Sequence, residues 1–152
     1  MSDEFPQQGR LAGIDYGSVR IGIAISDPQR ILASPYENYT RQDTDRDTTY
    51  FQQLVRDERV AGWIVGLPVH TSGDESQKSM EAREFGKWLA DVTACPVRYY
   101  DERFTTQLAN TLMGDSKLTK KQRKKRRDMI AAQLVLASYL ESCQQDLPPA
   151  PL

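Results

Sequence analysis

Two short Ile-rich runs near the start of the chain restrict its fold more than any other feature of the sequence. Residues 10–16 (RLAGIDY) and 20–26 (RIGIAIS) are separated by only three residues, which predicts a tight β-hairpin. An Asp-Pro turn then leads to a third predicted strand at 31–36. Hairpin strands are antiparallel, so any parallel strand added later in the chain must produce a mixed sheet.

Helical and strand patterns alternate in the rest of the chain. The expected order is a helix over 44–59 capped by Asp43 or Thr44, a strand over 61–66, a helix over 75–91, a strand over 95–101, and helices over 105–113 and 128–142. Strands joined by helical crossovers lie parallel, and their sheet collects functional groups at the carboxyl ends of the strands. The sequence therefore predicts one α/β domain at 10–143, with flexible tails at 1–9 and 144–152.

The charge of the chain is nearly balanced in total but unevenly distributed. Lys and Arg number 20, Asp and Glu number 21, and the formal net charge is −1. Residues 116–127 contain eight basic residues and no acidic one, which leaves −9 on the other 140 residues. Such a segment is typical of phosphate-backbone binding, although a solvated charged loop without a partner is the alternative. The expected nucleic-acid contacts are Lys120, Lys121, Arg123, Lys124, Lys125, Arg126 and Arg127.

Cysteine usage and hydrophobicity indicate the compartment. Cys95 and Cys143 have neither the spacing of a metal site nor that of a disulfide framework. The N-terminus lacks the features of a signal peptide, and the longest apolar stretch, 129–140, is too short to cross a bilayer. We therefore expect a cytoplasmic protein without a membrane partner.

Three acidic residues stand out by their positions. Asp15 lies inside the first apolar strand, where a charge is costly unless it is paired or bound to a metal. Glu102 ends the last predicted strand, and Asp128 opens the last long helix directly after the basic run. Glu102 could also be an ordinary polar residue leaving a strand, and Asp128 an ordinary helix cap. The three can converge if their strands are neighbours and the last helix begins across that edge.

Carboxylates without a cluster of Cys and His favour a hard divalent cation, Mg²⁺ or Mn²⁺. Together with the basic run, they indicate phosphodiester hydrolysis, in which two such ions activate a water and stabilise the leaving oxygen. Nucleophilic hydrolysis through a catalytic triad is disfavoured. His70 is the single histidine, no Ser lies in a GxSxG motif, and Cys95 precedes a proline.

Four segments in order resemble the motifs of the YqgF (RuvX) family of pre-16S rRNA nucleases and Holliday junction resolvases. They are GIDYGSVRIGIAISD (13–27), GLPVHTSGDES (66–76), YDERFTT (100–106) and KKRRDMIAAQLVLASYLES (124–142). The resemblance implies an RNase H-like fold with a five-stranded mixed sheet flanked by helices. It also implies divalent-metal-dependent hydrolysis of nucleic acid, with active-site acids that fall on Asp15, Glu102 and Asp128.

The sequence departs from the family pattern near the third acid. Arg127 precedes Asp128, where many members carry an apolar residue. Ala131 and Ala132 occupy the turn where relatives with four carboxylates have another acid. With three acids, a second metal would be held mainly by the substrate.

The leading hypothesis is a metal-dependent nuclease that acts on structured precursor rRNA during 5'-end maturation of 16S rRNA. One alternative is a resolvase of four-way DNA junctions, which needs a dimer, and the sequence leaves the oligomeric state open. Another is a non-catalytic nucleic-acid-binding module, which would bind with a steep salt dependence and cleave nothing. An actin-like kinase is disfavoured because it needs two such domains and a second phosphate motif.

Overall fold

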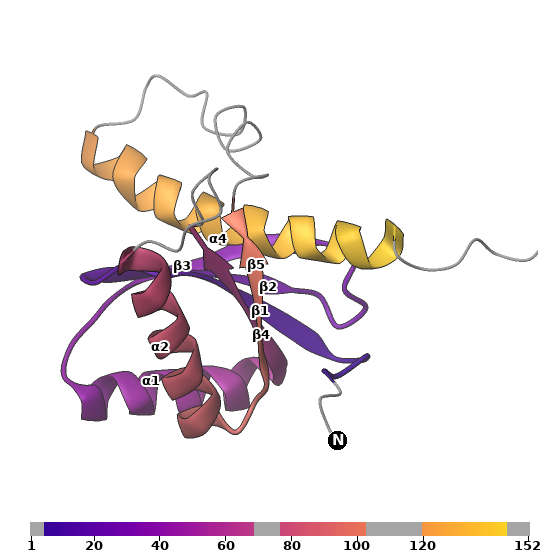
Figure 1. Cartoon of the computed structure of the whole chain (residues 1–152), viewed down its shortest axis with the longest axis horizontal. Coiled ribbons are helices and arrows are strands. Elements are labelled where there is room, and N and C mark those ends of the chain that lie inside the picture. Colours follow the sequence, from indigo (N-terminus) through magenta and orange to yellow (C-terminus); the bar gives the residue numbers. More distant parts are fainter. Residues whose placement is uncertain (1–4, 69–76, 103–119, 146–152) are drawn as a thin grey trace, which may run out of the picture.

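The computed structural model describes residues 5–68, 77–102 and 120–145, which form a five-stranded sheet between two layers of helices (Figure 1). The elements are β1 Arg10–Asp15, β2 Arg20–Ser26, β3 Ala33–Thr40, α1 Thr44–Glu58, β4 Val60–Leu67, α2 Gln77–Thr93, β5 Val97–Asp101 and α4 Lys120–Gln145. The helix predicted at 105–113 lies outside the described residues.

The strand order is β3-β2-β1-β4-β5. The first three strands are antiparallel neighbours, whereas β4 and β5 run parallel to β1. The predicted hairpin and the predicted mixed sheet are therefore confirmed. Asp43 caps α1, as expected, by accepting a hydrogen bond from the backbone N–H of Arg46 at 2.8 Å.

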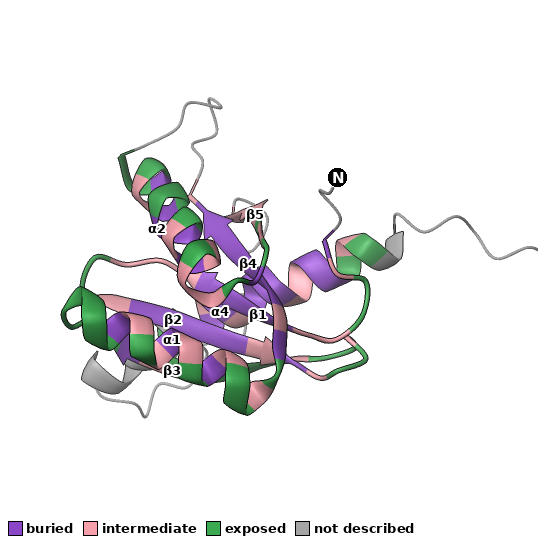
Figure 2. Ribbon diagram, turned by 90° about the horizontal axis from the view of Figure 1, so that it is seen from below, coloured by how far each residue is buried: buried purple, intermediate pink, exposed green. Residues whose placement is uncertain are grey.

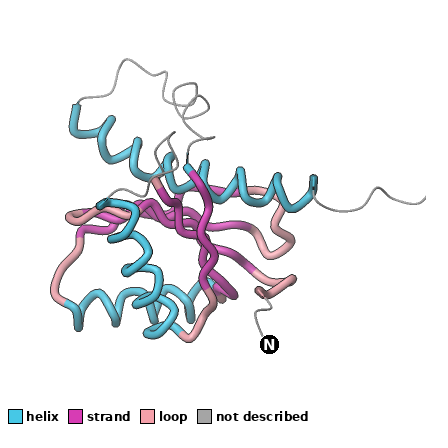
Figure 3. The backbone as a smooth tube through the Cα atoms, in the orientation of Figure 1, coloured by secondary structure: helices cyan, strands magenta, loops and turns pink. Residues whose placement is uncertain are grey.

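The two faces of the sheet are covered by different helices, and Figure 3 shows α4 on the side opposite α1 and α2. On the α1 and α2 side, Ile14 and Trp63 lie in a core rich in aromatic rings around Phe51. On the α4 side, Leu11 and Ile64 pack against the helix. Burial is concentrated in the central strands, while the outer helix surfaces are exposed (Figure 2). Strand alternation therefore directs Asp15 to the α4 face and Tyr16 to the α1 and α2 face.

Helix α4 packs across β1, β2 and β3. Its middle crosses β1 so closely that a Cβ on Gly13 would stand 2.8 Å from the Leu136 Cβ and 2.9 Å from the Ala132 carbonyl oxygen. Further along α4, Tyr139 accepts a hydrogen bond from Arg98 of β5 and packs against the Tyr100 ring.

The third strand lies later in the chain than predicted. The expected range was 31–36, but β3 begins at Ala33 and ends at Thr40. The Asp27 side chain accepts hydrogen bonds from the backbone N–H groups of Ile31 and Leu32, both at 2.8 Å, and Arg30 adopts a positive φ of 60°. These contacts form a turn that delays the strand, and Ile31 and Leu32 are exposed.

The last helix begins eight residues earlier than predicted, at Lys120 and not at Asp128. The prediction treated the basic run as a segment preceding the helix. Lys, Arg and Gln have good helix propensity, so the basic residues from 120 onward continue the helix. Asp128 therefore lies within α4 and is not its N-terminal cap.

Part of the N-terminal segment expected to be a flexible tail packs against the domain. Phe5 is buried in the core beneath α4, in an edge-to-face contact with Tyr139 at 6.3 Å between ring centroids. Arg30 donates hydrogen bonds to the carbonyls of Gln8 and Gly9 at 3.0 and 2.7 Å. Within the ranges described above, no helix is both long and apolar enough to cross a membrane.

Candidate active site at the carboxyl ends of the strands

Two of the predicted acids meet at one edge of the sheet. Asp15 is the last residue of β1, and Glu102 directly follows β5. Because β1, β4 and β5 are parallel neighbours, their carboxyl ends lie at the same edge, with β4 between the two acids. Asp15 and Glu102 are both partly buried, and their carboxyl groups are joined by a hydrogen bond. We call these two residues the acid pair.

The surroundings of the acid pair disfavour two negative charges. Burial raises the pKa of the Glu102 carboxyl above its ordinary value, and Asp101 acts in the same direction. The hydrogen bond with Asp15 and the ammonium group of Lys78 oppose this rise in pKa. The raised pKa favours a proton on Glu102, and a divalent cation could take the place of that proton.

Gly66 of β4 makes room for Glu102. A Cβ at this position would stand 2.8 Å from both the Glu102 Cγ and the Val135 Cγ2. The absent side chain lets Glu102 lie across β4 toward Asp15 while α4 packs from above. Gly66 opens the second family motif, 66–76, and no role was predicted for it. A glycine within an apolar strand is the signal that could have indicated a close approach.

The third predicted acid lies on the helix that covers this edge. Asp128 is one turn before Ala132 on α4, and Ala132 is the residue packed against Gly13 of β1. Asp128 therefore lies on the N-terminal side of the contact between α4 and β1. The Asp128 side chain lies outside the described part of the structure.

The donor set suits a hard divalent cation. Within residues 5–68, 77–102 and 120–145, no group of three or more His, Cys, Asp or Glu side chains could hold a metal ion. The acid pair offers carboxylate oxygens on one side of a partly open edge. Mg²⁺ typically takes one or two protein carboxylates and completes its shell with water and substrate phosphate. The acid pair alone therefore matches the minimum donor set for this ion.

Other predicted site residues are only partly described. The backbone of Lys120, Lys121, Arg123, Lys124, Lys125, Arg126 and Arg127 lies in α4. Of these side chains, only that of Arg127 belongs to the described part of the structure, and Arg127 is exposed. His70 lies outside the described residues. Lys78, which interacts electrostatically with Glu102, was not among the predicted site residues.

Comparison with known proteins gives consistent matches over most of the chain. Residues 9–142 match the sequence profile of a family described as RuvX, Holliday junction resolvase. A relative from Rhodopirellula baltica, named as a candidate pre-16S rRNA nuclease, is 51% identical over 142 residues, covering 93% of this chain and 82% of the relative. A relative of the same name from Corynebacterium jeikeium is 36% identical, covering 93% of this chain and 92% of its own.

Solved structures share the fold at low sequence identity. RuvC of Thermus thermophilus, determined in complex with a Holliday junction substrate, has a TM-score of 0.56 at 14% identity and covers 93% of this chain and 99% of its own. The yeast mitochondrial Holliday junction resolvase Ydc2 has a TM-score of 0.52 at 11% identity, covering 95% and 87%. These likenesses confirm the expected RNase H-like fold.

Proposed function

This chain belongs to the RuvX family, and we propose that it is a divalent-metal-dependent nuclease that hydrolyses phosphodiester bonds in precursor 16S rRNA. The observation that carries the proposal is the hydrogen-bonded acid pair, Asp15 and Glu102, at the carboxyl ends of β1 and β5. Two carboxyl groups held this close in a partly buried place are costly for the fold, and nucleolytic chemistry supplies a reason for them.

In this proposal, Asp15, Glu102 and Asp128 are the catalytic residues and hold Mg²⁺ or Mn²⁺. Asp15 and Glu102 provide carboxylate oxygens from two strands, and Asp128 provides the third from α4. When bound, the ions activate a water and stabilise the leaving oxygen of an in-line displacement. The protein residues hold the donors in place, since each acid lies on or beside a regular element braced by the close packing at Gly13 and Gly66.

The substrate is assigned from the relatives and from the charge distribution. The relatives that match most of the chain are named for pre-16S rRNA. The basic residues 120–127 occupy the N-terminal part of α4, directly before Asp128, and would bind backbone phosphates beside the acids. Ribosomal precursor as a substrate would place the protein in the cytoplasm.

The deciding experiment is cleavage of precursor 16S rRNA by the full-length protein, with and without Mn²⁺, beside an Asp15→Asn variant. We expect cleavage that requires the metal and is abolished by Asp15→Asn, with an unchanged circular dichroism spectrum. Unchanged turnover by the variant would overturn the proposal.

A second candidate function is resolution of four-way DNA junctions, which the description of the family favours. Junction DNA with the same metals and the same variant distinguishes the two substrates. Paired symmetric cuts in junction DNA, without cleavage of precursor rRNA, would replace the first function by this one. Metal-independent binding without any cleavage would instead identify a non-catalytic binding module.

A further inference from the structure

A cleft of about 250 Å³ opens directly beside the acid pair. Asp15 forms one wall, and the turn between β1 and β2, residues 16–19, forms the next. Arg20, the first residue of β2, and Lys78, in the first turn of α2, complete the lining. Two cationic side chains from different elements thus converge on a space that begins at a proposed catalytic acid.

The turn at 16–19 has a fixed shape. A Cβ at Gly17 would stand 2.3 Å from the carbonyl oxygen of Arg20, so no residue other than glycine fits this turn without rearrangement. Arg41 ties both ends of the turn. Its backbone N–H donates to the Val19 carbonyl at 2.9 Å, and its guanidinium donates to the Tyr16 hydroxyl at 3.3 Å. The wall of the cleft is therefore formed before any ligand binds.

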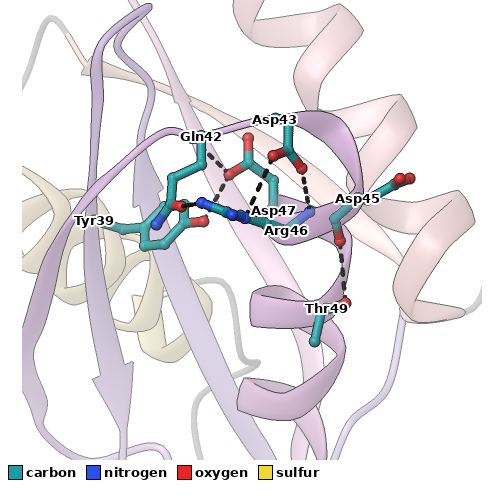
Figure 4. Close-up of polar contacts among 7 residues, drawn as sticks. All are labelled: Tyr39, Gln42, Asp43, Asp45, Arg46, Asp47 and Thr49. Carbon is teal, nitrogen blue, oxygen red and sulfur yellow. Dashed lines mark hydrogen bonds and ion pairs between the residues drawn. The ribbon is translucent and has the colours of Figure 1, made fainter.

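Arg41 is itself held by a buried carboxylate. The Asp47 side chain is almost completely buried, and its Oδ2 lies 3.6 Å from the Arg41 Nε. The Asp47 Oδ1 accepts hydrogen bonds from the Tyr39 hydroxyl at 2.6 Å and from the Gln42 backbone N–H at 2.9 Å, at the N-terminus of α1 (Figure 4). Moving Arg41 would separate the buried Asp47 Oδ2 from its ion-pair partner, which makes displacement of the turn costly.

The chemistry of the lining fits a phosphate. Arg20 and Lys78 carry positive charge, and Ser18 adds a hydroxyl group. Among the described residues of the lining, Asp15 alone is acidic, and in the proposed function its charge is neutralised by metal. Of the cleft residues, Tyr16 alone is aromatic, and its ring packs against Phe85 at 5.3 Å between centroids, so base stacking is not what the lining offers.

We propose that this cleft is a phosphate subsite, in which Arg20, Lys78 and the Ser18 hydroxyl bind a backbone phosphate of the substrate strand next to the cleaved bond. The proposal rests on the nuclease function and adds a second point of attachment, formed by the 16–19 turn, β2 and α2 and separate in the chain from the basic residues of α4. Its contacts are to the backbone and are therefore independent of base sequence. Two attachment points would hold the strand in register across the reacting bond.

The test measures affinity apart from cleavage. Full-length protein is titrated into a fluorescein-labelled precursor 16S rRNA fragment, with Ca²⁺ in place of Mn²⁺, at several salt concentrations. Because a charge-assisted contact is lost, Lys78→Ala and Arg20→Ala should each weaken binding about tenfold. Each should also lower the slope of log Kd against log salt concentration by about one. In Mn²⁺, the loss should appear in KM more than in kcat.

Two variants control for folding and for general charge. Lys78→Arg keeps the positive charge and should retain most of the affinity. Lys87→Ala removes an exposed lysine from the same helix, away from the cleft, and should leave the affinity and the salt slope unchanged. Unchanged affinity and slope in Lys78→Ala and Arg20→Ala would overturn the subsite, as would a fall in kcat alone. Failure of the nuclease function is separate, because it is reported by cleavage in Asp15→Asn.

Discussion

Asp47 and Glu102 are surrounded by opposite kinds of chemical group. Asp47, in the first turn of α1, is surrounded by donors, namely the Tyr39 hydroxyl, the Gln42 backbone N–H and the Arg41 guanidinium. Glu102, at the end of β5, faces another carboxyl group. Asp47 contributes to the rigidity of the domain, whereas the acid pair is held together by the rest of the fold. The two acids thus differ in their partners, which are hydrogen-bond donors around Asp47 and include a second carboxyl group beside Glu102.

The same contrast appears in how the two sides of the sheet are packed. The side of α1 and α2 is filled by interlocking rings, with Phe51 in edge-to-face contact with Trp63, Phe85 and Trp88. The side of α4 relies on close approach at Gly13 and Gly66, which leaves little tolerance for added atoms. Added volume at either glycine would therefore press on the elements that carry the proposed catalytic acids.

The largest expected effect is on cleavage in Glu102→Gln. Exchanging the carboxylate for an amide removes a proposed metal ligand while keeping the shape of the side chain. Metal stabilisation of a transition state amounts to several kcal/mol, so we expect at least about a hundredfold loss of kcat/KM in Mn²⁺. Steady-state cleavage of precursor rRNA measures it. Full activity would remove Glu102 from the proposed site.

Asp47→Asn makes the same chemical change in the other centre and should act on stability. The amide cannot pair with Arg41 as a carboxylate does, and hydrogen bonds to charged groups contribute about 1.5–3 kcal/mol. We expect a loss of about 2 kcal/mol in the free energy of unfolding, measured by urea denaturation. A stability equal to that of the wild type would mean that the Asp47 contacts contribute little and would weaken the contrast between the two centres.

Gly66→Ala tests the tight packing around Glu102. The added methyl group would stand 2.8 Å from the Glu102 Cγ and from the Val135 Cγ2. Overpacking typically costs about 1–3 kcal/mol, and here it should also displace a proposed catalytic acid, so both stability and cleavage should fall. Gly62→Ala is the matched control on β4, since its new methyl would meet the Phe5 ring at 2.8 Å, far from the acids. It should lower stability alone, and a comparable loss of cleavage in Gly62→Ala would contradict the local explanation.

The smallest effect is the pH dependence of stability in the metal-free protein. Burial raises the pKa of Glu102 above its ordinary value of 4.5, so the folded chain binds this proton more tightly than the unfolded chain does. The resulting stabilisation is present at pH values below 4.5 and is lost as the pH rises through the raised pKa. The amide in Glu102→Gln does not titrate, so the Tm of this variant should exceed that of the wild type increasingly as the pH rises above 4.5.

Thermal unfolding in EDTA from acidic to neutral pH measures this difference, with Lys87→Ala as a control that leaves the acid pair unchanged. A Tm difference that is independent of pH would contradict the raised pKa. Added Mn²⁺ should raise the Tm of the wild type more than that of Glu102→Gln, because only the wild type has both proposed carboxylate ligands.

Local patterns predicted the elements of the fold well where side-chain periodicity was strong. Alternation and capping rules predicted the hairpin, α1 with its Asp43 cap, and the parallel strands at 61–66 and 95–101. The predicted bounds were wrong for β3 and α4, where particular side chains changed the local structure. Asp27 holds a turn that moves β3, and good helix formers extend α4 back to Lys120.

The candidate site was predictable only in part. Asp15 drew attention because an acid within an apolar strand is costly, and Glu102 because it ends a strand. No local sequence pattern indicated that Lys78 belongs to the site, because a lysine in the first turn of a helix is common. Only the fold brings Lys78 beside Asp15 and Glu102. The sequence showed that residue 66 is a glycine, but it did not show that the Glu102 side chain occupies the space beside it.

Periodicity, turn chemistry and motif order were enough to predict the fold class, the family, the hairpin that makes the sheet mixed and the two acids at strand ends. The contact between Asp15 and Glu102, the space that Gly66 leaves for Glu102, and the cleft between the 16–19 turn and Lys78 could be found only in the folded chain. These features join residues up to 87 positions apart, as Asp15 and Glu102 are, and such residues meet only because β4 lies between β1 and β5 in the sheet.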